Sequence, residues 1–225
     1  MQVNIHNGLC LRDPKETTLG QSILKYSIIL IDELGFEHFT FKKLATKINS
    51  TEASIYRYFE NKHLLLVYLS NWYWEYMYVN IQSKTEHITS PTEKLKIAIA
   101  GILDSMMKND EISYIDEDIL HSIMVSQADK VYRIKEVTEE NKNGFFLAYK
   151  KVVRFISDIM LEVDPHFPYA RILASTLTEM PNQQLYYAKN LPSLTSLADQ
   201  EDNQSELQKV MENMAFTWIK AYKLI

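Results

Sequence analysis

Several residue types that define common classes of protein are scarce in this chain. Cys10 is the only cysteine, so neither an internal disulfide nor a cysteine-based zinc site can form. Only five glycines occur, and no glycine-rich phosphate loop, serine-centred elbow or Cys-His pair is present. We therefore expect a protein that is not an enzyme and that needs no cofactor.

One acidic segment could suggest a metal site. Asp118 and His121 stand one helical turn apart, and Glu117 lies four residues before His121. A carboxylate-bridged di-metal bundle needs a Glu-x-x-His pattern twice, with two further glutamates on other helices. Because no second copy is found, we interpret His121 as an ordinary histidine and predict no metal site.

Long apolar runs are also missing. The most apolar run extends from Ile28 to Ile31 and is followed at once by Asp32 and Glu33. No N-terminal segment combines a basic region, an apolar stretch and a cleavage site. We expect a soluble cytoplasmic protein that does not interact with a membrane.

Hydrophobic residues make up 46% of the 225 residues, which is ample material for a folded core. The apolar residues recur with helical period, and no credible strand pattern is found. The chain should be all-α, with helices at about 19–34, 40–48, 51–59, from 61 onward, 91–108, 116–128, 139–163, 168–189 and 205–224. Pro181 should kink or split the penultimate helix.

The segment from Thr40 to Lys62 predicts two short helices joined by a tight turn, with a third helix after them. Thr40 and Thr51 are each placed to cap a helix N-terminus. Asn49 lies where the chain must turn, and asparagine enters the left-handed region at modest cost. Two helices so joined are typical of a helix-turn-helix, and helical hairpins of other all-α proteins use the same caps.

The formal net charge of −5 does not favour DNA binding, because contact with phosphates normally needs a basic surface. The charges are unevenly distributed, however. Between Thr40 and Lys62 the cations outnumber the acids, whereas acidic tracts fall in the last two thirds of the chain. The cations are Lys42, Lys43, Lys47, Arg57 and Lys62, against Glu52 and Glu60.

The third helix ends in Tyr56-Arg57-Tyr58-Phe59, and Lys62 opens the next helix. With Gly35 and Phe39 before it, this pattern resembles the tetracycline-repressor (TetR) family of bacterial transcription regulators over about Leu19 to Leu69. Asn49 departs from the glycine that is usual in the family's turn, and Ser50 from an apolar residue. The resemblance implies an N-terminal three-helix DNA-binding head followed by a larger helical ligand-binding and dimerisation domain. We expect an arm at 1–16, the head at 17–62 and the larger domain at 63–225.

Residues at the start of the recognition helix reach furthest into the major groove, so Glu52, Ala53 and Ser54 are candidates for base contact. Glu52 either accepts a hydrogen bond from a cytosine amino group or stays solvated, where its negative charge excludes wrong sequences by repelling phosphate. Arg57 can reach a guanine or a phosphate. Other predicted DNA-binding residues, some resembling the family's backbone-contacting positions, are Thr40, Lys42, Thr51, Tyr56 and Lys62. Tyr58 and Phe59 should belong to the core of the head.

The resemblance also implies a homodimer through the last two long helices and a small effector bound in the body. A dimer would place two recognition helices about 34 to 36 Å apart, as an inverted-repeat operator on double-stranded DNA requires. Aromatic and methionine side chains make adaptable walls for a mostly apolar ligand. The candidate lining residues are Trp72, Tyr76, Met106, Met107, Tyr114, Met124, Phe145, Tyr149 and Met180, although such residues are also common in plain helical cores.

The family usually represses transcription until a small molecule releases the protein from its operator, so the resemblance predicts a ligand-relieved repressor. The alternative is a helical interaction module that keeps the fold without reading DNA specifically. The salt dependence of binding separates the two hypotheses. DNA binding anchored on phosphates weakens steeply as the salt concentration rises, whereas binding to an apolar partner should not.

Overall fold

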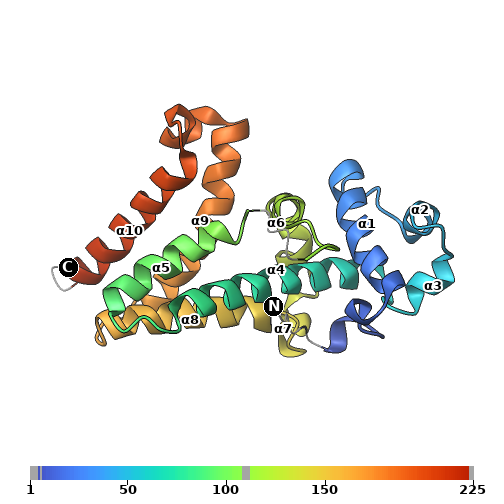
Figure 1. The fold of residues 1–225 in the computed structure, drawn as a ribbon, viewed down its shortest axis with the longest axis horizontal. Coiled ribbons are helices and arrows are strands. Elements are labelled where there is room, and N and C mark those ends of the chain that lie inside the picture. Colours follow the sequence, from blue (N-terminus) through green and yellow to red (C-terminus); the bar gives the residue numbers. More distant parts are fainter. Residues whose placement is uncertain (1–4, 6, 108–111, 223–225) are drawn as a thin grey trace. The chain divides into compact units, whose positions relative to one another are not determined.

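The computed structural model describes residue 5 and residues 7–107 and 112–222 of the chain. Within this part, all regular secondary structure is helical, as predicted (Figure 1). The chain divides into two compact units. None of the helices in the described part is long and apolar enough to cross a membrane.

Unit 1 is formed by residues 1–76 and 106–149. It contains the three helices of the predicted head, α1 to α3, and α1 contacts both α2 and α6 (Figure 1). Its elements are η1 (Asn7–Leu9), η2 (Pro14–Glu16), α1 (Thr18–Leu34), α2 (Phe41–Lys47), α3 (Glu52–Tyr56), the first part of α4 (Lys62–Thr85), α6 (Glu117–Tyr132), α7 (Val137–Lys142) and the start of α8 (Leu147–Val163).

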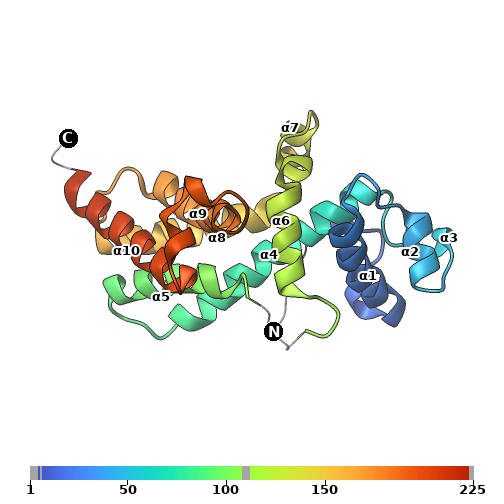
Figure 2. The same ribbon diagram turned by 90° about the horizontal axis from the view of Figure 1, so that it is seen from above.

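Unit 2 is formed by residues 77–105 and 150–225. It holds the remainders of α4 and α8 together with α5 (Pro91–Asp104), α9 (Ala170–Asn190), η3 (Pro192–Leu194), η4 (Ser196–Asp199) and α10 (Asn203–Ala221). Helix α10 packs against α5 and α9, as seen from above in Figure 2. The predicted helix ends at Lys108 and Leu224 lie outside the described residues.

Helix ends follow local capping chemistry. The Thr17 hydroxyl accepts a hydrogen bond from the Gly20 amide at 3.0 Å and opens α1. Ser90 caps α5 in the same way through the Glu93 amide, with Pro91 at the first helical position. These side chains satisfy amides that a helix leaves without partners in its first turn.

The prediction of one helix over 139–163 was wrong. Helix α7 ends at Lys142 and α8 begins at Leu147, and between them Gly144 has a φ of 83°. This left-handed conformation stops an α-helix, and glycine adopts it without a steric penalty. Helix α9, by contrast, continues through Pro181 without splitting.

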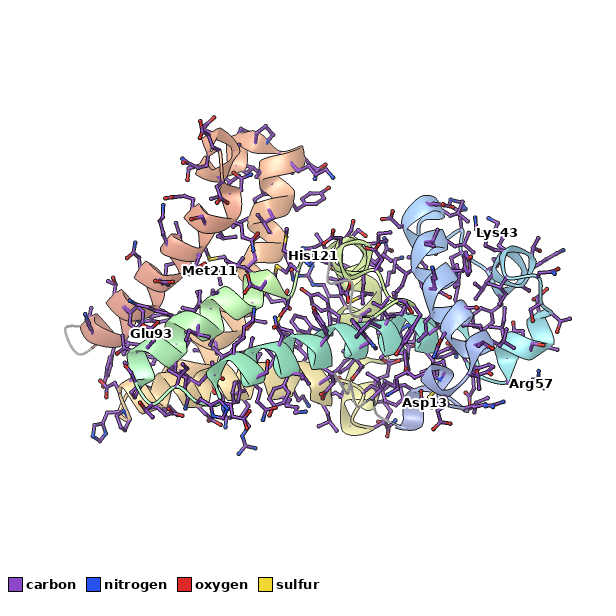
Figure 3. The ribbon with its side chains drawn as sticks, in the orientation of Figure 1. Asp13, Lys43, Arg57, Glu93, His121 and Met211 are labelled. Atoms are coloured by element: carbon purple, nitrogen blue, oxygen red, sulfur yellow. The ribbon has the colours of Figure 1, made fainter. Side chains whose placement is uncertain are left out.

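Helices α9 and α10 bury one face within unit 2 and leave another exposed. Met211 is fully buried and points from α10 into the packed interior of this unit (Figure 3). On the exposed side lie large apolar residues that a single unit does not cover: Tyr169, Ile172, Tyr186, Val210 and Met214. The two helices therefore offer apolar surface beyond what this unit buries.

Candidate nucleic-acid interface

The turn between α2 and α3 has the geometry of a Schellman motif. Asn49 has a φ of 52°, which confirms the predicted left-handed residue. The Ser50 amide donates to the Ala45 carbonyl at 2.9 Å, and the Asn49 amide donates to the Thr46 carbonyl at 3.3 Å. These two bonds end α2 and redirect the chain into α3.

Both predicted caps of the helix-turn-helix are confirmed. The Thr40 hydroxyl accepts from the Lys43 amide, and the Thr51 hydroxyl accepts from the Ser54 amide, each at 3.2 Å. A capping side chain contributes about 1 kcal/mol to the stability of a helix. Because α3 has only five residues, its start depends strongly on Thr51.

The outer surface of α3 carries the residues predicted to contact bases. Glu52 and Ala53 are exposed, and Ser54 is partly exposed. The Ser54 hydroxyl lies 2.9 Å from the Thr51 hydroxyl and accepts from the Arg57 guanidinium at 3.4 Å. Arg57 and Lys43 lie at the outer side of the head (Figure 3). The helix thus presents a short polar row with a cation at its end.

Aromatic side chains support α3 from behind. Tyr58 and Phe59 are 2% and 0% exposed, which confirms that they belong to the core of the head. Tyr56 is 48% exposed, and its ring packs edge-on against Phe41 with 5.0 Å between centroids. The phenol of Tyr56 is therefore held in place while it remains accessible, as a phosphate contact would require.

Lys62 is bound within the protein. Its ammonium donates to the carbonyls of Phe36, Glu37 and Phe39 at 2.9, 3.2 and 3.2 Å. The same nitrogen lies 4.7 Å from the centre of the Phe36 ring. This geometry gives Lys62 the role of fastening the connection between α1 and α2 to the start of α4. The sequence pattern singled out Lys62 but did not indicate these partners.

The segment before α1 packs onto the head. The Leu11 amide donates to the Tyr58 carbonyl at 2.8 Å, and the Thr17 hydroxyl lies 2.7 Å from the Tyr58 hydroxyl. Leu9 is completely buried. The sequence shows no hydrophobic periodicity in this region, because 3-10 helices of three residues are too short to produce one. Sequence reasoning therefore missed the connection of residues 9–17 to the end of the recognition helix.

Eight of the nine predicted ligand-lining residues belong to unit 1, whereas Met180 belongs to unit 2. Trp72 stacks on Tyr76 at 5.2 Å, and Tyr149 stacks at 4.2 Å on Trp74, which the sequence did not single out. Of the remaining residues of unit 1, Met106 and Met124 are buried, Tyr114 and Phe145 are partly buried, and Met107 is 52% exposed. Three of the five aromatic members, Trp72, Tyr76 and Tyr149, thus belong to stacked pairs on α4 and α8, and Met107 faces solvent.

His121 forms an interior contact. Its Nδ1 lies 3.2 Å from the Tyr73 hydroxyl, and its ring stacks on that of Tyr73. Burial lowers the pKa of His121 to about 4, so the ring is neutral at physiological pH. Across the described ranges, no group of three or more His, Cys, Asp or Glu side chains could hold a metal ion.

The geometry defines a helix-turn-helix protein with a short, capped and outward-facing second helix. The family model for bacterial regulatory proteins of the tetR family matches residues 23–69. This segment is therefore similar to the DNA-binding region of tetR-family regulators. No curated protein matches it in sequence.

Solved structures share the fold across most of the chain. A complex of AibR with isovaleryl coenzyme A and operator DNA is 17% identical, with a TM-score of 0.60, covering 86% of this chain and 96% of AibR. The fatty acid degradation regulator FadR from Bacillus halodurans is 18% identical, with a TM-score of 0.61 and coverages of 86% and 92%. The TetR family regulator PfmR from Thermus thermophilus is 14% identical, with a TM-score of 0.58 and coverages of 88% and 97%. At these identities the likeness shows the fold.

Proposed function

We propose that this protein is a ligand-responsive transcription regulator that binds an inverted-repeat operator as a homodimer and represses until a small, mostly apolar molecule releases it. The observation that carries the proposal is the outer row of the recognition helix. Glu52, Ala53 and Arg57 are exposed and Ser54 is partly exposed, in front of the buried aromatic residues Tyr58 and Phe59. The complex of a structural neighbour, AibR, with operator DNA and isovaleryl coenzyme A supports both parts of this function.

The DNA-contacting residues have distinct roles in this proposal. Glu52, Ala53 and Ser54 face the base edges, whereas Thr40, Lys42 and Tyr56 face phosphates on either side of the groove. Thr51 shapes the start of the helix through its bond to the Ser54 amide. Lys62 acts indirectly, by holding the connection before α2 through three carbonyls.

Dimerisation and effector binding complete the proposal. Two copies would join through the exposed apolar side of α9 and α10, which includes Ile172 and Met214, at 57% and 39% exposure. The effector would contact the aromatic pairs on α4 and α8, and its affinity would differ between the DNA-binding state and the released state.

The decisive experiment is selection of bound sequences from a random duplex library with the purified protein at near-physiological salt. Recovery of a short inverted repeat, bound with a steep decrease in affinity as salt rises, is the expected result. Binding to no duplex, with or without a panel of acyl compounds, would contradict the proposal and favour a helical interaction module.

Substituting Ser54 by alanine should change which operator bases are preferred, because it removes a hydroxyl from the outer row of α3. One base-specific contact is worth about 1 to 3 kcal/mol, so relative affinities for single-base variants should shift by about 5-fold to 150-fold. Fluorescence anisotropy with a set of duplexes measures this effect. Ser83→Ala, which removes an exposed hydroxyl from α4, should leave the preference unchanged. An identical ranking of duplexes in Ser54→Ala would exclude base reading by this residue.

Substituting Lys62 by methionine should weaken binding to every duplex about equally and reduce stability. The change keeps an unbranched stem beside Phe36 but leaves the carbonyls of Phe36, Glu37 and Phe39 without their donor. Two of the three bonds, to Phe36 and Phe39, are partly buried, so leaving these acceptors unpaired should cost about 1 kcal/mol, the lower end of the range for a buried group, which urea unfolding should reveal. The exposed Lys96→Met variant is the control for loss of a charge. Weaker DNA binding with unchanged stability would instead indicate that Lys62 contacts phosphate directly.

A further inference from the structure

An exposed cation, Arg12, lies in the segment before α1, outside the helix-turn-helix. Its guanidinium carbon is 5.6 Å from the centre of the Tyr58 ring, so this planar cation covers an aromatic face. Tyr58 directly follows Arg57, the last residue of the outer row of α3. In Figure 3, Arg57 and Asp13, which follows Arg12 in the chain, lie toward the lower side of the head. Arg12 is thus placed beside the C-terminal end of the recognition helix.

The backbone on both sides of Arg12 is held by hydrogen bonds. Before it, the Leu11 amide donates to the Tyr58 carbonyl at 2.8 Å. After it, the Asp13 carboxylate accepts from the Lys15 amide at 2.9 Å and closes a tight turn. A backbone that is already ordered loses little conformational freedom when a ligand binds, which favours binding to Arg12.

The positive charge of Arg12 is available to a ligand. Within the described ranges, its side chain has neither a hydrogen bond nor an ion pair. The neighbouring Asp13 pairs with Lys15 instead, with 3.5 Å between the carboxylate oxygen and the ammonium. Lys62 differs in this respect, because its ammonium is already held by three carbonyls. The N–H groups of the Arg12 guanidinium therefore remain for an external acceptor.

We propose that Arg12 binds a backbone phosphate of the operator, next to the end of the recognition helix; this inference rests on the DNA-binding function proposed above. Because Arg12 adjoins the row of α3 that faces the bases, the acceptor that a bound duplex brings to it is a phosphate. A guanidinium donates two parallel hydrogen bonds to phosphate oxygens while its flat face stays on an aromatic ring, here that of Tyr58. Such a contact adds affinity and fixes the register of the protein on DNA without reading sequence.

The test compares the salt dependence of operator affinity in Arg12→Gln and in the parent protein, measured by fluorescence anisotropy. Each neutralised phosphate contributes about 0.9 to the slope of log affinity against log salt concentration. A dimer carries two copies of Arg12, so the slope should be less steep by about 1.8 in the variant. At about 0.15 M salt this difference corresponds to roughly 30-fold lower affinity, and the loss should be equal for every duplex.

Two further variants separate a phosphate contact from mere support of Tyr58. Arg12→Lys keeps the positive charge, so its slope should equal that of the parent protein. Arg154→Gln removes the same kind of charge from an exposed side chain of α8, outside the head, where it lies 3.7 Å from Asp158. This control should leave both slope and affinity unchanged. Urea unfolding of Arg12→Gln should give the midpoint of the parent protein, because replacing an exposed side chain has little effect on stability.

The outcomes distinguish this inference from the proposed function. If the parent protein binds no duplex, the proposed function fails and the role of Arg12 fails with it. If the parent protein binds its operator and Arg12→Gln keeps the same slope and affinity, only the role of Arg12 is overturned. Lower affinity with an unchanged slope, a slope that Arg12→Lys does not restore, or a lower urea midpoint would show that Arg12 supports Tyr58, and would also overturn the inference.

Discussion

Replacing Gly20 by alanine should lower the free energy of unfolding by about 3 kcal/mol, the upper part of the range for inserting an atom into a packed site. A Cβ on Gly20 would lie 2.2 Å from the Pro14 carbonyl oxygen and 2.5 Å from the Pro14 Cα. These are backbone atoms, so no flexible side chain can move aside. The segment before α1 would have to separate from the helix, and urea unfolding followed by circular dichroism should measure the loss.

The sign of the Gly20→Ala effect is informative, because alanine in a helix is otherwise favoured over glycine by about 1 kcal/mol. Gly35→Ala supplies a comparison in which only conformation is strained. A Cβ there meets nothing within 4 Å, but the residue has a φ of 75° and a ψ of 154°, a conformation that essentially only glycine adopts, so the change should cost about 1 to 3 kcal/mol. If Gly20→Ala stabilises the protein, the close approach of Pro14 to α1 does not exist in solution.

Replacing Ile172 by aspartate should convert the proposed dimer into a monomer and reduce operator affinity at least 100-fold. Ile172 is 57% exposed on α9, and a carboxylate at the centre of an apolar interface would lose its hydration without gaining a partner. A monomer has one recognition helix and cannot occupy both half-sites of an inverted repeat together. Sedimentation velocity measures the assembly, and anisotropy with the selected operator measures the affinity.

Leu147→Asp is the matched control for this experiment. Leu147 is 54% exposed, nearly as much as Ile172, but it lies in α8 within unit 1. The variant should remain dimeric, because an exposed leucine outside an interface can be replaced at little cost. A dimer that survives Ile172→Asp, together with unchanged operator binding, would show that the two copies do not associate through this side of α9.

Local interactions explain what sequence reasoning predicted well. Thr40 and Thr51 cap the helices that directly follow them, and Asn49 turns the chain within a few residues of the carbonyls that it satisfies. Such contacts depend on near neighbours in the chain, so residue type and spacing are sufficient to predict them. The aromatic ending at Tyr58 and Phe59 was likewise assigned correctly to the core.

Other features depend on residues distant in sequence. The Lys62 ammonium meets carbonyls more than twenty residues earlier, which residue spacing alone does not reveal. The single helix predicted over 139–163 failed at Gly144, where a left-handed glycine outweighed an uninterrupted apolar pattern. The interpretation of the first residues as an arm likewise missed how the segment from Leu9 to Thr17 contacts Tyr58.

The sequence by itself determined the all-α class, the capped helix-turn-helix and its resemblance to TetR regulators, because periodicity, caps and a short aromatic motif are local properties of the chain. Only the tertiary structure decided that Lys62 fastens a loop and that Gly20 must be glycine beside Pro14. Each of these depends on the distance between atoms that packing, and not sequence proximity, brings together.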